Sequence, residues 1–143
     1  PFFRYGFRQR RALAQIEESF FERLVRHESA DDATFWDDQY ISNGGQLAQL
    51  CFGNYRMIAE LRAWLAKQRG LPGTTTKPYD CAGAILCARA AGAVIETPTN
   101  EAPLDFPLDA ETPVAFVGWA NRATAARLGP HLRAALADPP EVD

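Results

Sequence analysis

Asp80 is the residue whose type and surroundings point most clearly to chemistry. It comes two residues after Pro78, and the small and apolar residues that follow it as far as Gly92 predict a helix over residues 78–91. A carboxylate in the first turn of a helix is stabilised by the helix dipole, and the free amides of that turn attract phosphate oxygens. Carboxylate oxygens are also hard ligands suited to Mg²⁺. Asp80 is therefore a candidate magnesium ligand beside a phosphate, although an Asp at this place is, taken alone, more often a helix cap.

The segment around Asp80 carries a family resemblance. Residues 79–93, Tyr-Asp-Cys-Ala-Gly-Ala-Ile-Leu-Cys-Ala-Arg-Ala-Ala-Gly-Ala, resemble the second signature of the inositol monophosphatase family, which is an aromatic residue, an Asp, small residues, an apolar stretch and a Gly-Gly or Gly-Ala end. Cys87 departs from this pattern, because an aliphatic residue is usual there, and the departure changes packing alone. The resemblance implies that Asp80 binds Mg²⁺. It also implies an α/β layered domain with a central mixed sheet flanked by helices, like the second domain of phosphatases of the inositol monophosphatase and fructose-1,6-bisphosphatase superfamily.

Several residues are candidates for contact with a substrate. Ser42-Asn43-Gly44-Gly45 is similar to a turn of the family's second domain that lies against the substrate, and Glu60 falls near the family's contact to a substrate hydroxyl. Lys77 precedes Asp80 by three residues and could reach a substrate phosphate as a point charge. A plain tight turn and a solvated loop lysine are the structural alternatives. The candidates are Ser42, Gly44, Gly45, Glu60 and Lys77.

The remaining metal ligands of the family have no counterpart here. They come from a Glu-Glu pair and an Asp-Pro-(Ile/Leu)-Asp-Gly-Thr motif, both amino-terminal to the matched region, and neither is found in a matching context. Phosphoryl chemistry on two or three metal ions needs several converging carboxylates. The chain also opens with Pro1, and its only Met is Met57. We therefore expect residues 1–143 to be a single domain, the carboxy-terminal half of a two-domain phosphatase, inactive until joined to the amino-terminal domain of the same protein.

The resemblance implies an enzyme that hydrolyses a phosphate monoester of a small polyol, sugar or nucleotide. Mg²⁺ would activate water and polarise the phosphoryl oxygens, and no covalent phosphoenzyme is expected. The alternative is a non-catalytic module that keeps the fold, lacks the metal, and binds a ligand or mediates oligomerisation, with a homodimer as one such assembly. Upstream sequence that carries the two missing motifs would favour the enzyme, and a start codon just before Pro1 would favour the module.

Composition limits the partners. The chain of 143 residues is 47% apolar, which is enough for a core without disulfides or metal. The formal charge of −3 gives no reason to expect nucleic acid or an anionic membrane, and no apolar run approaches the roughly 20 residues that span a bilayer. A cluster of arginines near the start could meet a second phosphate or a nucleic acid, but a solvated face paired with nearby glutamates is favoured. The cluster consists of Arg4, Arg8, Arg10 and Arg11.

The number and spacing of the cysteines and histidines give no indication of a catalytic or metal site. Cys51, Cys81 and Cys87 are an odd number without paired spacing, which favours reduced thiols and a cytoplasmic location. His27 and His131 lie far apart and lack the spacing of metal ligands, so we expect ordinary surface or core residues.

Helical and strand patterns alternate along the chain, which is typical of an α/β layered domain. Helices are expected at 9–26, 46–52, 78–91 and 121–136, and strands at 2–7, 93–97 and 114–118. Residues 55–64 fit either a helix or a strand. Gly129-Pro130 should kink or split the last helix, and residues 138–143 should be frayed.

Overall fold

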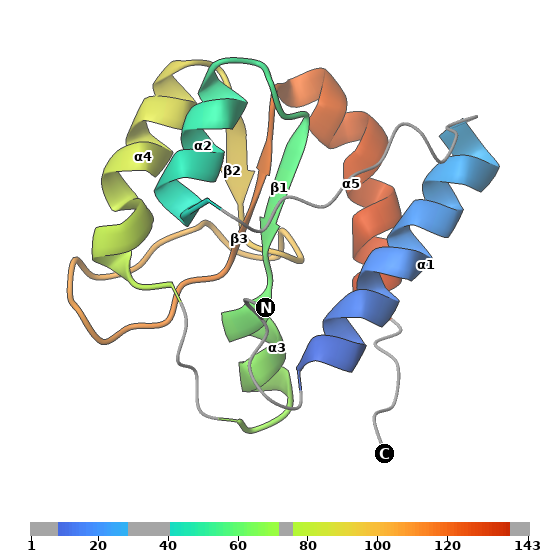
Figure 1. Cartoon of the computed structure of the whole chain (residues 1–143), viewed down its shortest axis with the longest axis horizontal. Helices are drawn as coiled ribbons and strands as arrows, with labels where there is room; N and C mark the ends of the chain where they lie inside the picture. The colour runs from blue at the N-terminus through green and yellow to red at the C-terminus, as the bar shows by residue number, and fades with distance from the viewer. Residues whose placement is uncertain (1–8, 29–40, 72–75, 138–143) are drawn as a thin grey trace.

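Helices and strands alternate along the described part of the chain. The computed structural model describes residues 9–28, 41–71 and 76–137. In chain order the elements are α1 (Arg10–Glu28), α2 (Asn43–Cys51), β1 (Met57–Glu60), α3 (Arg62–Gln68), α4 (Pro78–Ala90), β2 (Val94–Glu96), β3 (Phe116–Trp119) and α5 (Arg122–Ala137) (Figure 1). The predicted mixture of α and β structure is therefore confirmed, and the strand expected at 2–7 lies outside the described residues.

The strands form a small sheet in the order β1-β3-β2, and both pairings are antiparallel. Among the residues that the structure describes, the sheet is therefore wholly antiparallel, whereas the sequence predicted a mixed sheet. The reason lies in the long connection after β2, which returns the chain so that β3 enters between the two earlier strands in the opposite direction. Ile58 of β1 and Ile95 of β2 both pair with Gly118 of β3.

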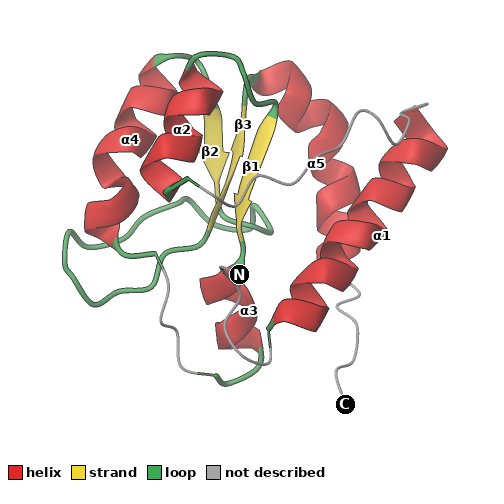
Figure 2. Cartoon of the chain, viewed as in Figure 1, coloured by secondary structure: helices red, strands yellow, loops and turns green. Residues whose placement is uncertain are grey.

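Helices cover both faces of the sheet (Figure 2). One hydrophobic cluster joins α2 and α4 to a sheet face that includes Phe116, and the other joins α1 and α5 to Val117 and Trp119. This division follows the alternation of side chains along a strand, and it explains why all four residues of β3 are buried. The two helix pairs and the sheet between them are the layered arrangement in which the candidate site is placed.

Gly118 lets α2 approach the sheet closely. A Cβ at this position would lie 2.9 Å from Ile58 Cγ1 and 3.0 Å from both Ile95 Cδ1 and Leu50 Cδ2. Because these side chains belong to both neighbouring strands and to α2, a larger residue would force them apart. The glycine thus helps to hold α2 against the strand that ends at Glu60.

Several sequence-based expectations need correction. Asn43-Gly44-Gly45 forms the first turn of α2, with Ser42 as its cap, in place of a free-standing turn. Residues 55–64, for which helix and strand were both open, divide into the strand β1 and the start of α3, with the boundary at Leu61. The helix α5 continues through Pro130 and is not split there, since burial of Leu132 and Leu136 in the core holds its second half in place. In the described ranges, no helix has the length and apolarity needed to cross a membrane.

Candidate functional site

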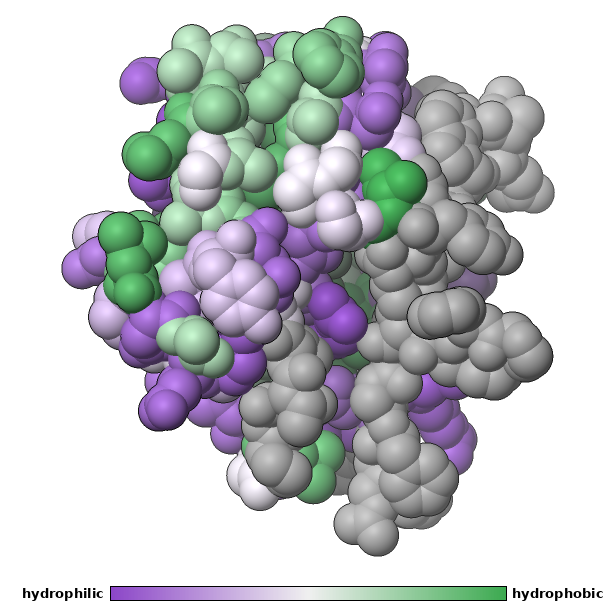
Figure 3. Space-filling model, turned by 60° about the vertical axis from the view of Figure 1, so that its left-hand side comes forward, coloured by the Kyte–Doolittle hydropathy of each residue, from purple (hydrophilic) through white to green (hydrophobic). Residues whose placement is uncertain are grey.

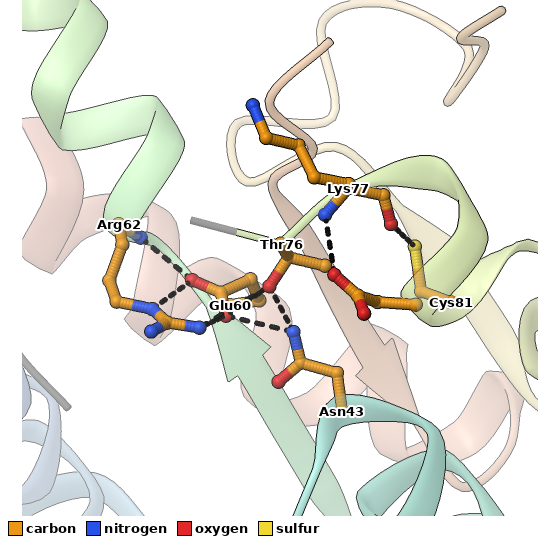
Figure 4. A network of polar contacts seen from close by, with 7 residues as sticks. Asn43, Glu60, Arg62, Thr76, Lys77 and Cys81 are labelled. Atoms are coloured by element: carbon orange, nitrogen blue, oxygen red, sulfur yellow. Dashed lines mark hydrogen bonds and ion pairs between the residues drawn. The ribbon is translucent and has the colours of Figure 1, made fainter. Parts of the chain in front are cut away.

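Three segments that are distant in the sequence meet at Glu60 (Figure 4). They are the first turn of α2, the end of β1 with the start of α3, and the residues that lead into α4. Asn43 Nδ2 donates to Glu60 Oε2 at 3.0 Å across 17 residues of sequence, and Thr76 Oγ1 donates to the same oxygen at 2.8 Å across 16 residues. Arg62 completes the group, because its backbone N and its Nε donate to Glu60 Oε1 at 3.1 and 2.8 Å.

The Glu60 carboxylate is buried and charged. Its residue is 6% exposed, and the Arg62 guanidinium forms an ion pair with it through Nη2 as well. Burial raises the pKa of the Glu60 carboxyl, but the hydrogen bonds and the charge of Arg62, together with Asn43 and Thr76, outweigh burial and leave the pKa below its usual value. Glu60 therefore carries its charge at neutral pH, and Arg62 compensates that charge locally.

Asp80 lies in the first turn of α4 with an exposed side chain. Its Oδ2 accepts a hydrogen bond from the Lys77 backbone N at 2.9 Å, which is the acidic half of a capping box. Lys77 cannot supply the other half, because an ammonium group has no acceptor. No described residue donates a hydrogen bond to Asp80 Oδ1. The capping role of Asp80 is thus present, and one carboxylate oxygen remains available at the surface.

The ammonium group of Lys77 points away from Thr76 and Glu60 (Figure 4). Its Nζ donates to the backbone oxygen of Glu111 at 2.5 Å, in the long connection between β2 and β3. The sequence-based interpretation placed this ammonium beside a substrate phosphate. In the structure the Lys77 side chain joins two loops, and this bond uses one of the three donors of its ammonium group.

The start of α2 lies directly against the start of α4. Ser42 Oγ accepts from the Gly45 backbone N at 3.1 Å, so both groups are engaged in the cap of α2. A Cβ built on Gly44 would lie 3.4 Å from the backbone oxygen of Asp80, which shows how closely the two first turns approach. Within the described ranges the Gly44 N–H has no hydrogen-bond partner, whereas the Gly45 N–H is used by the cap.

The described residues do not form a complete metal site. Within 9–28, 41–71 and 76–137, no group of three or more His, Cys, Asp or Glu side chains could hold a metal ion. Asp80 Oδ1 fits the role of one hard oxygen ligand. A magnesium ion bound there would need its other ligands from water, from substrate or from another part of the protein.

Asn43, Thr76 and Arg62 were not singled out from the sequence. A buried carboxylate must have hydrogen-bond partners, so burial of Glu60 would have signalled that such residues exist. Their identity depends on the packing of α2 and of the segment before α4 against β1, and no local pattern reports that packing.

Other reactive side chains lie outside this group. Burial raises the pKa of the Cys81 thiol to about 11, with the charges of Asp80 and Glu60 adding to the effect, so Cys81 stays protonated and is no nucleophile at neutral pH.

The contact between the two histidines was not predicted from the sequence. The rings of His27 and His131 stack at 5.5 Å between α1 and α5, where His131 Nε2 also lies 3.1 Å from Glu28 Oε1.

Comparison of the chain with models of protein families, with curated proteins and with solved structures found no match. The resemblance of residues 79–93 to the inositol monophosphatase signature stays a prediction from the sequence.

Proposed function

We propose that the protein is one half of a magnesium-dependent phosphatase that hydrolyses a phosphate monoester of a small polyol, sugar or nucleotide. The proposal depends on one observation. The turn 42–45, which the resemblance assigns to the substrate, and Asp80, which it assigns to the metal, are far apart in the sequence. The first turns of α2 and α4 are nevertheless in contact at Gly44 and Asp80.

The two first turns would form one wall of the phosphate site. Both helix starts are positively polarised and lie close together, which favours an anion such as phosphate beside them. The Gly44 N–H would donate to a phosphate oxygen, and Asp80 Oδ1 would bind a magnesium ion. Bound Mg²⁺ supplies Lewis-acid polarisation of the phosphoryl group and a water molecule of lowered pKa. Lys77 would donate to a phosphate oxygen with the donors of its ammonium group that Glu111 does not use.

The remaining ligands would come from an amino-terminal domain of the same protein that covers the outer face of α4. Tyr79 and Leu86 on this face are 71% and 66% exposed, although the opposite face already packs Cys81 and Ile85 into the core. A helix that is apolar on both faces is typical of a buried helix. Figure 3 shows apolar surface over α2 and α4. Because Asp80 lies at one end of this face, a domain docked there could bring further carboxylates to it.

The test is magnesium-dependent phosphate release by the product of the whole gene, including any residues encoded before Pro1. Asp80→Asn should lower turnover at least about 100-fold, because an amide is a poor ligand for Mg²⁺. Asp105→Asn is the matched control, since Asp105 is an exposed carboxylate in the connection between β2 and β3. Near-normal turnover of Asp80→Asn, or equal loss in both variants, would remove Asp80 from the mechanism.

A metal-free binding or oligomerisation module is the second candidate. It is favoured by the lack of a three-residue ligand group in the described ranges. This candidate predicts that thermal stability of the whole gene product does not respond to Mg²⁺ and that Asp80→Asn leaves ligand binding or oligomeric state unchanged.

A further inference from the structure

We infer that Glu60 is a positioning residue, which fixes the first turns of α2 and α4 relative to each other, and that it does not contact the substrate. Its role in catalysis rests on the proposed function, whereas its role in holding the two helices rests on the contacts alone. The inference replaces the substrate-hydroxyl contact that the family resemblance suggested for this residue.

The Glu60 carboxylate is saturated with hydrogen-bond donors of the protein. Oε1 accepts from the backbone N and Nε of Arg62, and Oε2 accepts from Asn43 Nδ2, Thr76 Oγ1 and Arg62 Nη2. A carboxylate offers about four lone-pair positions, so these donors fill it. The side chain is only 5% exposed. A substrate hydroxyl could reach it only by displacing a protein donor that would then be buried without a partner.

The donors to Glu60 come from three separate parts of the chain. Asn43 opens α2, Arg62 opens α3, and Thr76 leads into α4. A backbone hydrogen bond also fixes Thr76, because its carbonyl oxygen accepts from the Val114 backbone N at 2.9 Å. Glu60 is thus the common acceptor of three chain segments that no strand or helix joins directly.

A short path of contacts joins Glu60 to Asp80. Thr76 is followed by Lys77, whose backbone N–H donates to Asp80 Oδ2 at 2.9 Å. Fixing Thr76 therefore fixes the donor that orients the Asp80 carboxylate. On the other side, Asn43 Nδ2 contacts both Glu60 and Thr76, and the next residue, Gly44, lies against the Asp80 carbonyl.

The charge of Glu60 supports the same role. The guanidinium of Arg62 pairs with both carboxylate oxygens, so the pair is close to neutral as a unit. A neutral, buried pair does not compete with Asp80 for a cation. Asp80 is then the carboxylate that faces solvent where the starts of α2 and α4 meet.

Kinetics of the whole gene product can separate positioning from substrate contact. Glu60→Gln and Thr76→Val should lower kcat/KM by the same factor for a polyol phosphate and for an aryl phosphate that has no hydroxyl. Both variants should also raise the magnesium concentration that gives half-maximal activity. A loss confined to the hydroxylated substrate would overturn the inference, because removal of a direct contact penalises only the substrate that makes it.

Hydrogen exchange gives a readout that needs no activity. Glu60→Gln and Thr76→Val should speed exchange of the Lys77 amide by about tenfold or more, as expected for local opening, with little change in α5. Thr76→Val keeps the side-chain shape and covers the case in which Glu60→Gln does not fold. Glu96→Gln is the matched control, because Glu96 accepts from Trp119 Nε1 at 2.8 Å away from the start of α4. Unchanged exchange at Lys77, or a uniform increase over the whole chain, would overturn the inference even if the protein is no phosphatase.

Discussion

Asp80→Asn and Asp80→Ala together separate the hydrogen bond of Asp80 from its charge. The Asn side chain keeps an oxygen that can accept from the Lys77 backbone N, which donates at 2.9 Å in the native protein. The Ala side chain removes both the acceptor and the charge. The difference in unfolding free energy between the two variants therefore measures the bond, and the difference between Asn and the native residue measures the charge.

The structure sets the size of both effects. Asp80 is exposed, so neither variant opens a cavity, and solvent screens the charge. Loss of a negative charge in the first turn of a helix costs about 0.3–1 kcal/mol, and the lower half of that range is expected here. Loss of a capping acceptor costs about 1 kcal/mol. We expect Asp80→Asn to be destabilised by about 0.5 kcal/mol and Asp80→Ala by about 1.5 kcal/mol.

Urea unfolding followed by tryptophan fluorescence is a suitable assay, because Trp119 is 1% exposed in the core. Asp105→Asn again serves as the control for a surface charge. Equal destabilisation of the Asn and Ala variants would refute the role of the Lys77 bond. A clear gain of stability in Asp80→Asn would refute the favourable interaction with the helix dipole, and would indicate instead that other carboxylates crowd Asp80 in the absence of metal.

Three further predictions concern packing and reactivity. Gly118→Ala should destabilise the protein by about 1–3 kcal/mol in urea unfolding, because the added methyl group would lie 2.9 Å from a buried side chain, and a neutral result would contradict the tight packing of α2 on the sheet. Iodoacetamide at pH 8 should modify the exposed Cys87 in the folded protein but Cys81 only in urea, since the pKa of Cys81 is raised to about 11, and equal labelling by mass spectrometry would argue against burial of that thiol. Leu86→Lys should lower the melting temperature of the whole gene product more than Leu108→Lys, because only Leu86 lies on the apolar face of α4, and equal shifts would count against a domain docked there.

The regular elements of this chain could be predicted because their signals are local. The stripe of Leu13, Ile16, Phe20 and Leu24 recurs at helical spacing and is the buried side of α1. Asn43-Gly44-Gly45 misled the prediction for the opposite reason. Glycine favours turns in isolation, but here Ser42 caps the segment and α4 packs against it, so tertiary contact and capping decide in favour of helix.

The candidate site could be predicted only in part. The order of residue types around Asp80 indicated its place in the first turn of α4, and the resemblance pointed to Glu60. The partners of Glu60 were out of reach, because Asn43 and Thr76 are 17 and 16 residues away and meet it only when α2 and the start of α4 pack together. Position along the chain also cannot tell a substrate contact from a buried ion pair. Burial of the carboxylate and the nearness of Arg62 decide that question.

The capping and metal-binding interpretations of Asp80 do not exclude each other. A carboxylate has two oxygens, and the bond from the Lys77 backbone occupies only Oδ2. Carboxylates that bind metals are themselves commonly held by hydrogen bonds, since a ligand with a fixed orientation loses less freedom when the ion binds. The contacts from Glu60 through Thr76 to Lys77 would hold Asp80 in this way and leave Oδ1 without a donor among the described residues. Thr76→Val should therefore reduce magnesium affinity, although the Asp80 side chain itself is unchanged.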